Sequence, residues 1–135
     1  MPRIATMFFK FAVVFLLLGI LMGLQMAISG NHNVIGAHAH SNLLGWVTSA
    51  VFGGYYALNP AKAETRLAGI HFWIYTVSIA IMIPALYLFY LGYQAVEPLL
   101  PITSIAALVA VLVFAVVVYA PAVPSSGRAK LSPAE

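Results

Sequence analysis

Four long apolar stretches divide the chain, and each is about as long as a bilayer is thick. They are residues 8–28, 37–58, 67–91 and 101–120. A helix rises about 1.5 Å per residue, so about 20 residues cross the roughly 30 Å of hydrocarbon. Because lipid offers no partners for open backbone groups, a segment that crosses it must be helical. The sequence therefore predicts an all-α integral membrane protein with four spans.

Composition supports this class, because 63% of the residues are hydrophobic and only 7% are charged. A soluble domain carries about 25% charged residues, which its solvated helix faces require. Short connections between the stretches predict antiparallel neighbouring helices. We therefore expect one four-span domain over residues 1–120. Residues 121–135 are rich in Pro, Ser and Ala and are predicted to form a disordered cytoplasmic tail.

The basic residues are distributed asymmetrically. With four spans, all six fall on one side of the membrane, and the opposite loops, residues 29–36 and 92–100, contain none. The positive-inside rule then places both termini in the cytoplasm, and we expect a protein of a bacterial inner membrane. The net charge of +3 is explained by topology, so a nucleic-acid partner is excluded. The six residues are Arg3, Lys10, Lys62, Arg66, Arg128 and Lys130.

Two histidines, His38 and His40, open the second stretch. Residues two apart on a helix diverge by about 200°, so these side chains cannot bind the same ion or sandwich the same porphyrin. Ionisable groups at membrane depth are candidates for function, and neutral imidazole is a good ligand for iron. The alternative is that one or both are interfacial histidines bonded to water or lipid head groups. The chain has no cysteine, which excludes thiolate sites and covalent c-type heme.

Small residues recur at four-residue spacing in the first two stretches. They favour close helix–helix packing, although such a face also accepts a flat ligand. They are Gly19 and Gly23 in the first stretch, and Gly45, Ser49 and Gly53 in the second.

Two segments carry a resemblance to a known family. "IGAHAHSNLLGWVTSAVFGGYYALNP" resembles the tenth helix of the catalytic subunit of heme–copper oxidases, especially C-family oxidases and nitric oxide reductases. "IHFWIYTVSIAIMIPALYLFYLG" resembles the eleventh helix, which opens with His-Phe-Trp. The similarity covers roughly residues 35–92, and the flanking spans would correspond to the ninth and twelfth helices.

The resemblance implies a b-type heme cofactor. In the family, the first histidine of the pair ligates the high-spin heme and the second ligates the low-spin heme, on opposite faces of the helix. This implies that His38 and His40 are iron ligands and that Asn42, Gly45 and Trp46 lie beside the cofactor. His71 matches a histidine that does not bind iron, so we assign it to structure or a hydrogen bond. His32 falls in a loop, where a solvated side chain is expected.

The chain also departs from the family in ways that limit its chemistry. The oxidase subunit has twelve spans, and this chain has no counterpart of the histidines that hold copper. Reduction of oxygen or nitric oxide by this chain alone is therefore not expected, and no catalytic residue is assigned. The family's helices form three arcs of four with pseudo-threefold symmetry. A chain that resembles one arc predicts a homotrimer with heme between subunits.

Three functions remain open. The leading hypothesis is a bis-histidine heme protein for electron transfer or for heme or gas sensing. The second is a minimal heme oxidoreductase that acts on a quinone or a small gas. The third is an accessory or assembly subunit without a cofactor. Expected partners are other copies of the chain, membrane lipid, and a quinone or an electron-transfer partner at the outer face.

Overall fold

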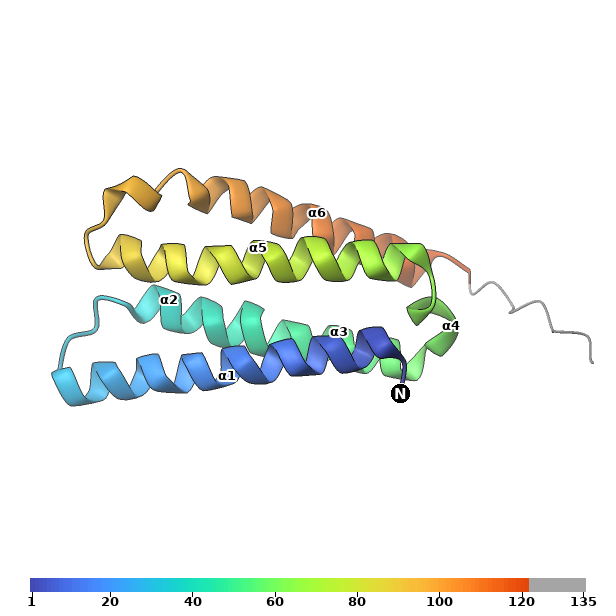
Figure 1. Ribbon diagram of the computed structural model, residues 1–135, viewed down its shortest axis with the longest axis horizontal. Helices are drawn as coiled ribbons and strands as arrows, with labels where there is room; N and C mark the ends of the chain where they lie inside the picture. The colour runs from blue at the N-terminus through green and yellow to red at the C-terminus, as the bar shows by residue number, and fades with distance from the viewer. Residues whose placement is uncertain (122–135) are drawn as a thin grey trace, which may run out of the picture.

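The computed structural model describes residues 1–121, which form a bundle of antiparallel helices (Figure 1). Every regular element in this range is helical, which confirms the predicted all-α class. The elements in chain order are α1 (Arg3–Ser29), α2 (Ile35–His40), the π-helix η1 (Ser41–Thr48), α3 (Ser49–Leu58), α4 (Pro60–Ala63), α5 (Arg66–Tyr90), the 3₁₀-helix η2 (Gln94–Val96) and α6 (Leu99–Tyr119).

Three helices in the described range are long and apolar enough to cross a membrane. They are α1, α5 and the segment Gln94–Tyr119, which combines η2 with α6. This is compatible with an integral membrane protein. The second predicted span is helical without a break from Ile35 to Leu58, but its hydrogen-bonding pattern changes from α to π and back. Of the predicted tail, residues 122–135 lie outside the described part of the chain.

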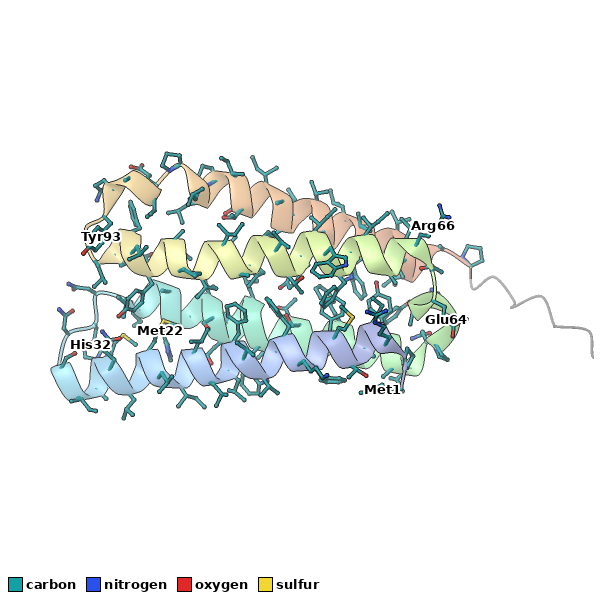
Figure 2. All side chains as sticks on the ribbon, viewed as in Figure 1. Met1, Met22, His32, Glu64, Arg66 and Tyr93 are labelled. Carbon is teal, nitrogen blue, oxygen red and sulfur yellow. The ribbon has the colours of Figure 1, made fainter. Side chains whose placement is uncertain are left out.

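The two ends of the bundle differ in what they hold. The N-terminus, α4 and the end of α6 lie at one end, and the α1–α2 and α5–α6 connections lie at the other (Figure 1). Figure 2 shows Met1, Glu64 and Arg66 at the first end and His32 and Tyr93 at the second. The basic residues at the starts of α1 and α5 are therefore at the same end, as the antiparallel arrangement requires.

An aromatic cluster joins the helices near the end that holds the N-terminus. Phe52 of α3 lies 4.5 Å from Phe114 of α6 between ring centroids, and Phe8 of α1 lies 4.9 Å from Phe72 of α5. Tilted and edge-on aromatic pairs at such distances are favourable beyond the area they bury. One core therefore contains side chains from α1, α3, α5 and α6.

Glycines allow α1 to approach the second helical segment closely. A Cβ atom on Gly45 would lie 2.5 Å from the Phe15 side chain, and one on Gly19 would lie 2.6 Å from Asn42 Oδ1. Gly23 faces the imidazole of His38 in the same way, at 3.0 Å. The small residues at these positions therefore serve helix–helix packing, as their four-residue spacing predicted.

We expect Gly45→Ala to destabilise the bundle by about 1–3 kcal/mol, because the added methyl group overpacks the contact with Phe15. Gly54→Ala is the matched control, since a Cβ atom there meets no atom within 4 Å. Thermal unfolding in detergent, followed by circular dichroism, measures both. Equal midpoints for the two variants would contradict this account of the packing.

Candidate functional site

The predicted pair of histidines lies in α2, at the end of the bundle opposite the N-terminus (Figure 1). His38 is half-buried against α1, whereas His40 is exposed. Both residues have regular α-helical neighbours on their N-terminal side, so the expected divergence of about 200° applies. Within one chain the two side chains therefore face different surroundings.

His38 is oriented by a neighbouring helix. Its Nδ1 lies 2.8 Å from the backbone carbonyl oxygen of Gly19 in α1. A carbonyl oxygen only accepts, so Nδ1 of His38 must carry the proton and donate. The amide of Asn42 lies 3.4 Å from the same Nδ1 but donates to the His38 carbonyl at 2.9 Å. In the neutral imidazole, Nε2 of His38 then holds the free lone pair.

His40 is oriented by its own helix. Its Nδ1 lies 2.8 Å from the carbonyl oxygen of Gly36, four residues earlier. The same argument protonates Nδ1 and leaves Nε2 of His40 as the unprotonated nitrogen. In the described part of the chain, Nε2 has no hydrogen-bond partner in either histidine. Both imidazoles are thus held in the tautomer that binds a metal through Nε2.

A short ladder of polar contacts fixes this segment against α1. The Ser41 hydroxyl donates to the Phe15 carbonyl at 2.9 Å, one helical turn from the Gly19 carbonyl that His38 uses. Ser41 is fully buried, so this bond replaces the hydration that the hydroxyl loses. The side chain of Asn42 fills the space above Gly19.

A π-helix begins directly after His40, which the sequence analysis did not predict. In η1 the side chain of Thr48 donates to the Leu43 carbonyl at 2.7 Å, and Ser49, which follows η1, donates to the Leu44 carbonyl at 3.3 Å. Tyr75 of α5 also donates to the Leu44 carbonyl, at 2.9 Å. Single π turns inside helices occur often at functional sites. No residue pattern that we considered in the sequence predicts this change of helix type.

The other residues predicted beside the cofactor have different environments. Asn42 and Gly45 face α1 and pack there within the protomer. Trp46 is exposed, with 37% of its surface accessible. Their predicted contact with heme stays a prediction.

His71 lies near the opposite end of the bundle and is fully buried in the aromatic cluster. Its Nδ1 is 3.0 Å from the Tyr56 hydroxyl, in agreement with a hydrogen-bonding role. Its Nε2 has no partner among the described residues. His32 is exposed in the loop after α1, as expected.

No group of three or more His, Cys, Asp or Glu side chains within residues 1–121 could hold a metal ion. A porphyrin supplies four of the ligands of its iron, so one or two imidazoles from the protein are sufficient. His38 and His40 could serve as such ligands, and the predicted heme stays a prediction. Comparison with protein-family models, curated proteins and solved structures found no match.

We expect Tyr56→Phe to destabilise the protein by about 1–3 kcal/mol, because buried His71 loses its hydrogen-bond partner. Tyr93→Phe, which removes an exposed hydroxyl, is the control. Removing both partners in Tyr56→Phe/His71→Phe should recover part of the loss, since no polar group is then left unpaired. Unfolding in detergent tests this, and an unchanged stability of Tyr56→Phe would contradict it.

Proposed function

We propose that this chain is a four-span membrane protein that binds b-type heme through Nε2 of His38 and Nε2 of His40. The observation that carries the proposal is that Nδ1 of each imidazole lies at hydrogen-bonding distance from a backbone carbonyl, from which the shared tautomer is inferred. Each Nδ1–H is used by a backbone carbonyl, at 2.8 Å in both cases. This leaves two oriented nitrogen lone pairs at one level of the bundle. The resemblance to the tenth helix of heme–copper oxidases supports the same two ligands.

The proposed heme lies between subunits. His38 and His40 diverge, so one helix cannot give both axial ligands to one iron. His71 is near the other end of the bundle and His32 is in the loop, so neither completes the site within a protomer. A six-coordinate heme would take His38 from one protomer and His40 from the next. Threefold closure, as in the arcs of the related family, uses every ligand once.

The residues around His40 are suited to a cofactor with a hydrophobic body. Leu43 and Val47, which follow it in η1, are exposed by 61% and 42%. Such apolar side chains exclude water from a porphyrin edge, while the backbone carbonyl of Gly36 keeps the imidazole oriented. Heme, when bound, supplies one-electron redox chemistry or a gas-binding iron. We propose electron transfer or sensing as the role and assign no catalytic residue.

The proposed topology has four spans with both termini in the cytoplasm. Here the continuous helix from Ile35 to Leu58 is the second span. Single cysteines can test this directly, because the natural chain contains none. A thiol reagent that does not cross membranes should label Ser29→Cys and Tyr93→Cys in intact cells. Glu64→Cys should react only after lysis, and labelling of Glu64→Cys from outside would refute the topology.

The visible spectrum of the purified protein tests the ligands. We expect a Soret band and, on reduction, sharp split α and β bands typical of six-coordinate heme. His38→Ala and His40→Ala should each lose this spectrum, whereas His32→Ala and His71→Ala should keep it. Loss of heme from folded His71→Ala would overturn the assignment of ligands.

Mixed assemblies test the position between subunits. Co-expression of His38→Ala with His40→Ala should restore part of the six-coordinate heme, because a heterotrimer rebuilds one intact interface. A monomer that retains a full complement of low-spin heme would exclude the intersubunit site. Broad bands with carbon monoxide binding would favour the minimal oxidoreductase, and absence of a Soret band would favour the cofactor-free subunit.

A further inference from the structure

A groove of about 420 Å³ lies between α1 and α5, in the half of the bundle that contains His38. Its volume is within the range of small-molecule sites. Leu18 and Leu21 of α1 and Leu88 of α5 form walls that are 38–59% exposed, so the groove is open along its side. In the proposed topology this opening faces hydrocarbon, from which an apolar ligand can enter.

One polar pair crosses this apolar groove. The Tyr87 hydroxyl donates to Gln25 Oε1 at 2.9 Å. Gln25 is the only polar side chain between Lys10 and Ser29. It is exposed, one turn from the end of α1, and also borders the loop residues Asn31 and Asn33. With Oε1 engaged by Tyr87, the amide N–H groups of Gln25 remain as donors. They have no acceptor among the described residues, and a ligand carbonyl would satisfy one of them.

The uncharged lining of the groove favours a neutral ligand. None of the residues that line it is charged. The two loops at this end of the bundle, residues 29–36 and 92–100, contain no Lys or Arg. A phospholipid phosphate is recognised by Lys and Arg side chains, so this end of the bundle does not favour phospholipid binding. The chemistry instead fits an apolar molecule whose polar part is a neutral carbonyl group.

Pro84, which lines the groove, leaves one backbone carbonyl of α5 without a hydrogen-bond donor. Proline has no backbone N–H, so the carbonyl of Ala80 lacks its α-helical donor. Ala80 is exposed and lies one turn from Pro84, toward the middle of α5. Ala80 itself is not among the residues that line this groove, so its carbonyl is assigned no role in ligand binding.

The groove also adjoins the proposed iron ligand. Met22 lines it, and the next residue, Gly23, packs against the imidazole of His38. We propose that this groove binds a lipid-soluble quinone, with the Gln25 amide donating to a ring carbonyl and the isoprenoid tail following Leu21 and Leu18. The choice of a quinone among neutral carbonyl compounds rests on the proposed heme function, since a one-electron cofactor needs a redox partner.

Binding of a short-chain ubiquinone to the purified full chain in lipid nanodiscs tests the proposal. Gln25→Leu should weaken binding about tenfold, which corresponds to about 1.4 kcal/mol and to one lost hydrogen bond in an apolar site. Leu21→Trp should abolish binding by filling the groove. Tyr90→Phe is the matched control. Tyr90 is one turn from Tyr87, but its hydroxyl packs against Gly36 and Tyr90 does not line the groove.

The same titration on His38→Ala separates this proposal from the heme site. If the groove is a quinone site, His38→Ala binds the quinone whether or not the wild type holds heme, and Gln25→Leu keeps the wild-type visible spectrum. Wild-type affinity in both Gln25→Leu and Leu21→Trp would overturn the proposal. Displacement of the quinone by phospholipid at equal concentration would also overturn it, and would identify the groove as a lipid site.

Discussion

The structure depends on polar side chains that donate to backbone carbonyls inside an apolar bundle. Hydrocarbon provides no water, so a buried hydroxyl or imidazole needs a partner in the protein. Ser41 and His38 find theirs on α1, at the carbonyls of Phe15 and Gly19. Gly19 and Gly45 allow the close approach of the two helices at which these bonds form. The close packing of these two helices and the orientation of the first candidate ligand are therefore linked.

The helical class and the ends of the helices follow closely from the sequence. Apolar length predicted four spans; three helices in the described range are long and apolar enough to cross a membrane, and α2, η1 and α3 together cover the second predicted span. Small-residue spacing also predicted which faces of α1 and the second segment pack. It did not predict what fills each space, because Asn42 over Gly19 and Phe15 against Gly45 depend on the axial register of two helices. Spacing within one helix contains no information about that register.

Each of the two features that sequence reasoning missed depends in part on a contact between residues far apart in the chain. The π-helix after His40 is supported by Tyr75, which donates to Leu44 from 31 residues away. The pair that crosses the groove, Gln25 and Tyr87, is separated by 62 residues. An α-helical periodicity analysis assumes 3.6 residues per turn throughout and sees neither feature. What it did predict about the histidines, their divergence, is a local property of one short helix.

The two histidines are held by different kinds of contact, and this difference matters for the proposed assembly. His38 is held by a carbonyl of another helix, so its orientation depends on correct packing of the protomer. His40 is held by a carbonyl in its own helix, so it is oriented without help from the rest of the bundle and stays exposed. A histidine that binds iron at the surface of a neighbouring subunit must be exposed and oriented by its own helix, as His40 is. In the proposed trimer, each iron would bind His38 of one protomer, whose orientation depends on folding, and the exposed His40 of the next protomer. Heme binding would therefore require both a folded protomer and assembly.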